Sequence, residues 1–241
     1  MIKFKLLLIF LILSISSFVV FITLNPSDLK IHRKDRVKVA ILDSGINPST
    51  FKNKNINIIK RHNCKVTSIH GSVVLQALLT EAKLKRRQSL TIYDYQVSTF
   101  DHNASVDKVI SSINDAIAND VDIVNLSLGF NKEQPKLKKT IEKAINRGII
   151  IIAAGGNTYG FYTEYPALYD DVIAIGAQEN NKISDYSAVD EIDYFIKGKY
   201  KSYTGTSIST AYATGSVINN MLNNQKLFDS KNFKKRDDLI D

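Results

Sequence analysis

The feature that most limits the fold of this chain is a series of apolar runs separated by stretches with helical periodicity. The apolar runs lie at residues 37–42, 121–128, 148–154 and 172–177, and helical spacing of apolar residues occurs at residues 106–118 and 137–146. Apolar runs of this length are typical of strands that are buried on both faces, and strands that alternate with helices favour a parallel sheet. The sequence therefore predicts an α/β domain with a mostly parallel central sheet.

One of the intervening stretches shows the helical pattern in detail. Leu137, Ile141, Ala144 and Ile145 follow the i, i+4, i+7, i+8 spacing that places apolar side chains on one face of a helix. Gly148 lies just past the last of them, where helices commonly end. We expect an amphipathic helix here that connects two strands of the sheet.

The chain begins with a membrane-directed segment. Residues 6–24 are almost all Leu, Ile, Val and Phe, and Lys3 and Lys5 precede them. About 20 apolar residues span a bilayer, and a charged front followed by an apolar run is typical of a signal peptide or an anchor. No small-x-small cleavage site follows around residues 18–25, which favours an anchor that is not cleaved. Basic residues at 30–38 favour the cytoplasmic side, so the orientation stays open.

The remainder of the chain has the pattern of one domain with a polar end. A short polar linker follows the apolar segment, no internal repeat is present, and polar and charged residues dominate after Asn223, where we expect the chain to fray. The predicted parts are an N-terminal membrane anchor or signal segment (1–24), a linker (25–36), the α/β domain (37–222) and a polar C-terminal tail (223–241). The domain is expected outside the cytoplasm, either anchored to the membrane or, if the first segment is cleaved, secreted.

Charge and cysteine content argue against several classes of protein. The formal net charge is +8, but the basic residues are scattered and lack interleaved aromatic side chains, so we expect a solvated surface and no nucleic-acid partner. The single cysteine, Cys64, leaves no pair for an internal disulfide or a zinc site. Residues 43–47 lack the glycine pattern and the lysine of a phosphate-binding loop, which argues against a nucleotide-binding domain.

Side chains that are far apart in the chain suit nucleophilic catalysis. Ser207 lies in a small-residue run before a helical stretch, Asp43 ends an apolar strand, and His70 begins a segment with helical spacing. A serine nucleophile needs a base that takes its proton, a carboxylate that orients the base, and donors for the oxyanion. Asn157, which follows an apolar run, supplies an uncharged amide donor. Alone, these motifs are explained as turns, a surface histidine or a helix cap; together they indicate a candidate serine protease triad.

These motifs resemble those of the subtilisin family of serine proteases, in which the catalytic order is Asp, His, Ser. The segments that carry the resemblance are VAILDSGI around Asp43, HGS at His70, VNLSLG at residues 124–129, IIAAGGN ending at Asn157, YPALYDDVIAIGA from Tyr165 and YTGTSIS around Ser207. The resemblance implies a small membrane-anchored member of the family with a subtilisin-like fold, which is a three-layer α/β sandwich around a central, mostly parallel sheet.

By the same resemblance the protein is expected to be a monomeric serine endopeptidase that acts on an extended peptide or protein substrate without a cofactor. Asp43 would orient His70, and His70 would act as general base and then as general acid. Ser207 would attack the peptide carbonyl, while Asn157 and the backbone amide of Ser207 would stabilise the oxyanion. Every group that the reaction needs is present in the sequence.

The resemblance also implies where the substrate lies. Ser127, Leu128 and Gly129 are expected to form an extended edge that pairs with the substrate backbone. Glu164 precedes a Tyr-Pro pair, and this position lies near the floor of the primary specificity pocket in the family. A carboxylate there would favour Arg or Lys before the scissile bond, which suits maturation of a secreted peptide. The alternative for Glu164 is a solvent-facing residue in a loop.

The sequence departs from the family pattern at several positions. Val73 stands where the family often has a second histidine and Thr210 where a proline is usual, and neither change removes a catalytic group. The segment at residues 81–88 is short and basic. It lacks the Asn-rich loop that forms the calcium site of the family, so no metal is expected. Too few residues precede the first strand for a folding prodomain, which leaves unaided folding and a separate chaperone open. The alternative function is an inactive subtilisin-like protein that binds peptides or confers immunity at the membrane.

Overall fold

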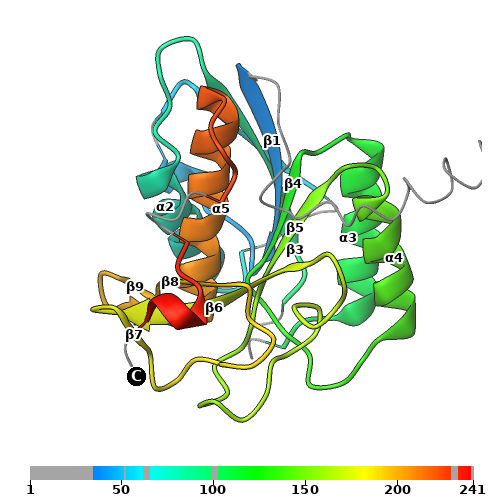
Figure 1. Ribbon diagram of the computed structural model, residues 1–241. Helices are drawn as coiled ribbons and strands as arrows, with labels where there is room; N and C mark the ends of the chain where they lie inside the picture. The colour runs from blue at the N-terminus through cyan, green and yellow to red at the C-terminus, as the bar shows by residue number, and fades with distance from the viewer. Residues whose placement is uncertain (1–34, 52, 62–65, 99–102, 229–232, 240–241) are drawn as a thin grey trace, which may run out of the picture.

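The computed structural model describes residues 35–51, 53–61, 66–98, 103–228 and 233–239. These residues form three layers, with a sheet between two pairs of helices (Figure 1). One face of the sheet is covered by α2 (His70–Glu81) and α5 (Thr206–Asn223), and the other by α3 (Val106–Ala118) and α4 (Pro135–Ile145). The expected α/β sandwich is confirmed.

The central sheet has 8 strands in the order β2-β3-β1-β4-β5-β6-β7, with β8 paired to β6. Neighbouring strands are parallel except β6 and β7. The strands are β1 (Arg36–Asp43), β2 (Ile56–Lys60), β3 (Ser89–Gln96), β4 (Ile123–Leu126), β5 (Ile150–Ala154), β6 (Ile173–Glu179), β7 (Lys182–Ile183) and β8 (Tyr194–Lys197). Outside this sheet are the antiparallel pair β9 (Lys199–Tyr200) and β10 (Tyr203–Thr204) and the 3-10 turns η2 (Pro48–Thr50) and η3 (Arg236–Asp238).

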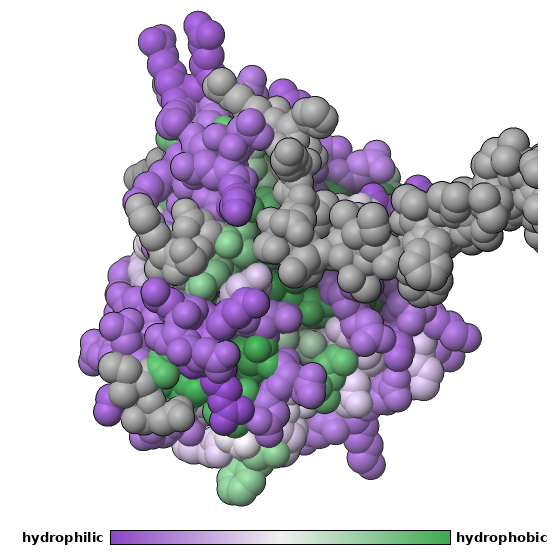
Figure 2. Space-filling view, viewed as in Figure 1, coloured by the Kyte–Doolittle hydropathy of each residue, from purple (hydrophilic) through white to green (hydrophobic). Residues whose placement is uncertain are grey.

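Apolar side chains on both faces of the sheet explain why its strands are continuous apolar runs. In β1, Val39 and Ile41 belong to the apolar cluster that includes α2 and α5, whereas Ala40 and Leu42 belong to the cluster that includes α3 and α4. All four side chains are fully buried. Successive side chains of a strand point to opposite faces, so one run of sequence contributes to both clusters. On the outer surface, hydrophilic residues dominate the face shown in Figure 2 and separate smaller apolar patches.

The helices α2 and α5 approach each other closely at Gly215. A Cβ at this position would overlap the carbonyl oxygen of Leu78 and lie 2.9 Å from Cβ of Glu81. The lack of a side chain at Gly215 therefore sets the separation of the two helices. Both helices begin at the edge of the sheet where the parallel strands end, so their first residues face the end of β1.

The chain after α5 differs from the expected frayed tail. Leu227, Phe228 and Phe233 are buried, and the backbone N–H of Phe195 in β8 donates a hydrogen bond to the carbonyl oxygen of Lys234 (2.7 Å). Apolar residues spaced widely in a polar sequence have no helix or strand periodicity, which is why the sequence alone suggested fraying. In the structure these residues cover the edge of β8.

The predicted membrane anchor, residues 1–24, lies outside the described residues, as does all but the end of the linker 25–36. The helices that the structure does describe include none with the length and apolar character needed to cross a bilayer. The anchor therefore stays a prediction from the sequence. Cys64 also lies outside the described residues.

Candidate active site

Asp43 and His70 meet where β1 ends and α2 begins. Nδ1 of His70 lies 2.9 Å from Oδ1 and 3.0 Å from Oδ2 of Asp43, which is buried. The hydroxyl oxygen of Ser44 accepts a hydrogen bond from the backbone N–H of Gly71 (2.9 Å) and ties the strand end to the helix. A Cβ at position 71 would lie 2.8 Å from the carbonyl oxygen of Gly45 and 3.2 Å from Oδ1 of Asp43. A glycine at position 71 thus allows the loop and the helix to approach.

Burial and charge act in opposite directions on His70. Burial lowers the pKa of the imidazole, whereas the charge of Asp43 and the hydrogen bond to it raise the pKa, and the net pKa lies above the usual value. An ionised carboxylate can only accept hydrogen bonds, so Nδ1 carries the proton of the neutral imidazole. Nε2 is then free to accept a proton, as a general base requires.

Ser207 lies in the first turn of α5. The preceding Gly205 has φ of 147°, a conformation that favours glycine. The hydroxyl of Ser207 donates a hydrogen bond to the carbonyl oxygen of Ser127 (3.1 Å). The structure describes both Ser207 and His70, and the two side chains line the same cleft, but no hydrogen bond joins the Ser207 hydroxyl to His70. Asp43 and His70 are thus in contact, while the Ser207 hydroxyl points to Ser127.

Buried polar side chains join the end of β4 to α5. The hydroxyl oxygen of Ser127 lies 3.1 Å from Oδ1 of Asn125 and 3.1 Å from the carbonyl oxygen of Ser207. Nδ2 of Asn125 donates to Oγ1 of Thr214 (2.9 Å). Asn125 and Thr214 are fully buried. The sequence did not reveal this network, and its only signal there was polar residues, Asn125 among them, inside a mostly apolar run.

A cleft of about 340 Å³ lies at the ends of β1 and β4 and the starts of α2 and α5. It is lined by the predicted residues Asp43, His70, Ser127, Leu128, Gly129, Asn157 and Ser207, and also by Ser44, Ser98, Ala104 and Thr204. Ser98 and Ala104 pair in an isolated antiparallel bridge. No local sequence pattern revealed them, because their place in the cleft depends on the backbone pairing between them.

Asn157 follows β5 and lies beside the start of α5. Its Oδ1 accepts hydrogen bonds from the backbone N–H of Thr206 (2.9 Å) and from the Thr206 hydroxyl (3.2 Å). Because Oδ1 is held by these donors, the amide nitrogen Nδ2 is left to donate toward the cleft that Asn157 lines. A Cβ at Gly205 would lie 3.1 Å from Nδ2.

Glu164 is not among the residues that line the cleft, but it lies against one that does. A Cβ at Gly129 would overlap Oε2 of Glu164, and a Cβ at Gly156 would lie 2.9 Å from both Cγ and Oε2. The two glycines therefore make room for this carboxylate beside the cleft. Burial raises the pKa of Glu164. This partly buried position differs from the solvent-facing alternative considered from the sequence.

The segment that follows α2 is tied to the end of α5. Gln88 is buried, and its Nε2 donates to the carbonyl oxygen of Leu222 (2.9 Å). Nζ of Lys85 donates to Oδ1 of Asn223 (2.5 Å). Among the residues that the structure describes, no group of three or more His, Cys, Asp or Glu side chains is arranged to hold a metal ion. The expectation that this segment binds no calcium stays a prediction.

Comparisons with known proteins agree with the resemblance seen in the sequence. The chain is 30% identical over 205 residues to the Minor extracellular protease Epr of Bacillus subtilis (strain 168), an alignment that covers 75% of this chain and 29% of that protein. It is 30% identical over 213 residues to Subtilisin of Bacillus pumilus, with 75% of each chain covered. The chain spans about half the length of other curated relatives, for example 54% of Subtilisin E of Bacillus subtilis (strain 168).

A solved structure shows the same fold. The crystal structure of a cold adapted subtilisin-like serine proteinase superposes with a TM-score of 0.64 at 18% sequence identity and covers 81% of this chain and 79% of that chain. The model of the Subtilase family matches residues 34–228, which include Asp43, His70, Asn157 and Ser207. Because the family model matches most of the length of the chain, the chain belongs to the subtilase family.

Proposed function

We propose that this chain is a serine endopeptidase that hydrolyses peptide bonds in extended substrates through Asp43, His70 and Ser207. The observation that supports the proposal most is the contact between Asp43 and His70 at the side of a cleft that Ser207 also lines. Membership of the subtilase family supports the same reaction. We infer that the reaction needs no cofactor, because the side chains at the cleft supply every group that acyl transfer requires.

The first step needs a change of the Ser207 rotamer. Rotation about its Cα–Cβ bond would release the hydroxyl from the carbonyl of Ser127 and direct it to Nε2 of His70. Nε2 then accepts the hydroxyl proton as Oγ attacks the substrate carbonyl carbon. The carboxylate of Asp43 stabilises the imidazolium, which next protonates the leaving amine. Water releases the acyl group from Ser207 in a second round of the same proton transfers.

Donors at the start of α5 are suited to the charge that develops on the substrate carbonyl oxygen. Nδ2 of Asn157 and the backbone N–H of Ser207 are the proposed oxyanion donors. The hydrogen bonds from Thr206 to Oδ1 of Asn157 hold this amide in place before the substrate arrives. The positive end of the α5 dipole adds to the stabilisation of negative charge there.

The substrate backbone is proposed to pair with the extended edge at Ser127, Leu128 and Gly129, which continues from the end of β4. The side chain before the scissile bond would then lie near Glu164, because Glu164 lies against Gly129. We propose that this carboxylate gives a preference for Arg or Lys. A preference of this kind suits the maturation of a secreted peptide rather than general digestion of protein.

One observation favours a second candidate function. The hydroxyl of Ser207 is bonded to Ser127 and not to His70, and a protein that keeps this rotamer when a peptide is bound would be an inactive subtilisin-like peptide-binding or immunity protein at the membrane. The two functions differ in the reactivity of one hydroxyl. They are therefore separated by a chemical label rather than by a binding assay.

The test is labelling of the full chain with a serine-reactive phosphonate. We expect stoichiometric labelling of Ser207, loss of the label in Ser207→Ala, and no loss in the matched variant Ser202→Ala, whose serine is exposed. Labelling is read by mass spectrometry of the digested protein. Absence of labelling in a folded wild-type protein would favour the inactive function, and labelling that survives Ser207→Ala would exclude Ser207 as the nucleophile.

We propose that the domain lies outside the cytoplasm, held by the apolar segment at residues 6–24 or secreted if that segment is cleaved. The support is the length of this segment, which matches the thickness of a bilayer. Fractionation of cells into membrane, cytoplasm and medium tests the location. Protein found only in the cytoplasm would contradict it.

A further inference from the structure

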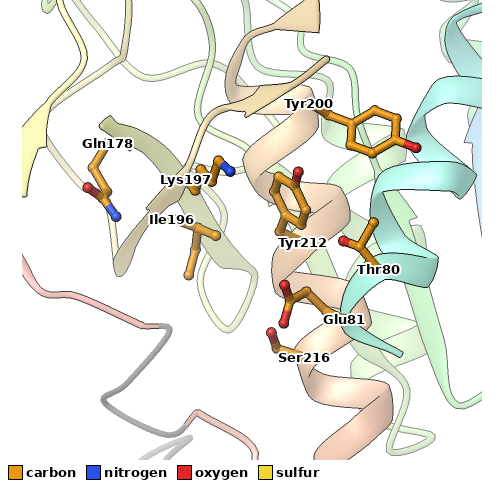
Figure 3. A pocket seen from close by; sticks show the side chains of 8 residues that line it. All are labelled: Thr80, Glu81, Gln178, Ile196, Lys197, Tyr200, Tyr212 and Ser216. Carbon is orange, nitrogen blue, oxygen red and sulfur yellow. The ribbon is translucent and has the colours of Figure 1, made fainter. Parts of the chain in front are cut away.

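A second pocket lies on the side of the sheet that α2 and α5 cover. Its volume is about 440 Å³, and it is bounded by the end of α2, the middle of α5, and the strands β6 and β8 (Figure 3). None of the residues that line it lines the cleft at Ser207, whose volume is about 340 Å³. It is therefore a separate cavity, and its volume is within the range of about 300–1,000 Å³ that is usual for small-molecule sites.

Opposite charges lie on facing walls of this pocket. Figure 3 shows the carboxylate of Glu81 pointing into it from α2 and the ammonium of Lys197 pointing into it from the side of β8. Within the described parts of the chain, neither group forms an ion pair. Nearby lysines differ, because Nζ of Lys199 lies 3.9 Å from Glu179 and Nζ of Lys201 donates to Gln76 (3.2 Å). Glu81 and Lys197 are thus both available to a ligand.

Two tyrosine rings, those of Tyr200 and Tyr212, also line this pocket. The centroids of Tyr200 and Tyr212 are 6.5 Å apart with an interplanar angle of 73°, and Nζ of Lys197 lies 6.0 Å from the centroid of Tyr212. The Tyr212 hydroxyl donates to the carbonyl oxygen of Lys199 (3.1 Å), so this ring has a fixed orientation. Burial, with a smaller contribution from the charge of Glu81, raises the pKa of Tyr212. The phenol is therefore neutral and offers an aromatic face to an apolar group.

The elements that carry the two charges are closely packed or paired with their neighbours. Glu81 is at the end of α2, where the contact with Gly215 leaves no room for a side chain between α2 and α5. Lys197 is at the end of β8, in register with Gln178 of β6. A ligand that meets both charges would not have to order a loop first, so little conformational entropy would be lost on binding.

We propose that this pocket binds a short peptide with free termini, two to three residues long, as a zwitterion. The ammonium of the ligand would pair with Glu81, its carboxylate with Lys197, and an apolar side chain would pack on Tyr200 and Tyr212. A simple anion would be repelled by Glu81 and a simple cation by Lys197, whereas a zwitterion satisfies both charges. Because the ring of Tyr212 lies beside the ammonium of Lys197, a dipeptide with an aromatic side chain next to its carboxylate suits the wall best.

The experiment is isothermal titration calorimetry of the full chain with the dipeptide Ala-Phe. We expect saturable binding, and binding that is about fivefold or more weaker for N-acetyl-Ala-Phe and for Ala-Phe amide, each of which lacks one charge. Lys197→Met and Glu81→Gln are expected to weaken binding of Ala-Phe by a similar factor. Each substitution should abolish the discrimination against the ligand that lacks the matching charge.

Matched controls are available on the opposite face of the sheet. Lys139→Met and Glu142→Gln remove exposed charges from α4 and should leave the affinity for Ala-Phe unchanged. All titrations are repeated in Ser207→Ala, so the result does not depend on whether the chain is a peptidase. The proposal is overturned if Ala-Phe does not bind, if the blocked peptides bind equally well, or if Lys197→Met and Lys139→Met have the same effect.

Discussion

The imidazole of His70 is balanced between burial, which lowers its pKa, and Asp43, which raises it. The pKa is therefore expected above the ordinary value of 6.5. Asp43→Asn removes the charge but keeps the burial, so the pKa of His70 should fall below that of the wild-type protein. Titration of the imidazole resonances by NMR measures both values, with His70→Gln identifying the signal. A midpoint that is unchanged in Asp43→Asn would show that the contact does not set the pKa.

The same shift has opposite consequences for stability and for activity. A pKa that is raised on folding contributes stability that is fully present below the unfolded pKa and is lost as the pH rises through the folded pKa. The Asp43–His70 contact should therefore stabilise the protein more at pH values below 6.5 than in alkaline solution. Catalysis needs the neutral imidazole, so kcat/KM should rise with pH through the same pKa.

Glu164 provides a prediction about specificity. Burial raises the pKa of this carboxyl, so its charge is lost at a higher pH than for an exposed glutamate. The ratio of kcat/KM for peptides with Arg over those with Leu before the scissile bond should fall as the pH is lowered through this raised pKa. In Glu164→Gln the ratio should be lower by about tenfold and independent of pH. The exposed residue Glu191 provides the control Glu191→Gln. An unchanged ratio in Glu164→Gln would show that Glu164 does not set the preference for Arg.

At the scale of single residues, the sequence is informative where chemistry and order carry the signal. Asp43, His70 and Ser207 were proposed as acid, base and nucleophile because these residue types occur in a recognisable order, and the structure places all three at one cleft. The residues that hold these side chains in place were not identified from the sequence. The hydrogen bond from the backbone N–H of Gly71 to the Ser44 hydroxyl, for example, depends on how closely β1 and α2 approach in space. The direction of the Ser207 hydroxyl toward Ser127 is a choice between rotamers, which no sequence pattern contains.

The separation of α2 and α5, the helices that contain His70 and Ser207, depends on the absence of a side chain at Gly215. Because a Cβ at Gly215 would overlap the carbonyl oxygen of Leu78, Gly215→Ala must push α2 away from α5. We expect a loss of about 1–3 kcal/mol in the free energy of unfolding, as for overpacked cores. Chemical denaturation measures it, with Asn219→Ala on the partly exposed face of α5 as the control. Equal stability of Gly215→Ala and the wild type would contradict a tight crossing.

Most elements with a strong apolar pattern were predicted, including β4 despite its Asn125, whereas β3 was not. The strands β1, β4, β5 and β6 and the helices α3 and α4 lie where the pattern placed them. The strand β3 contains Asp94, which is fully buried and whose Oδ2 accepts a hydrogen bond from the backbone N–H of Ile46 (3.0 Å). An acidic residue inside a buried strand interrupts the apolar pattern by which strands are predicted. Its hydrogen-bond partner, Ile46, lies in another part of the chain, so the sequence around Asp94 does not reveal it.

At the scale of the whole molecule, the end of the chain completes the packing of the sheet. Phe233 is 2% exposed, and its ring centroid lies 5.3 Å from that of Tyr194 and 5.1 Å from that of Phe228. Together with the hydrogen bond between Phe195 and Lys234, these contacts cover the edge of β8. The described residues 233–239 lie beyond the residues that the family model matches, so the resemblance could not predict this packing.

If the end of the chain folds together with the rest of the domain, loss of one buried ring there should destabilise the whole molecule. Phe233→Ala should lower the free energy of unfolding by about 3–5 kcal/mol, as for other buried aromatic side chains. The control Asp237→Ala removes an exposed side chain nearby and should change stability by less than about 0.5 kcal/mol. Denaturation followed by both far-UV circular dichroism and tyrosine fluorescence measures the change. A single shifted transition would show one cooperative unit, whereas an unchanged midpoint would mean that the segment at Phe233 detaches before the domain unfolds.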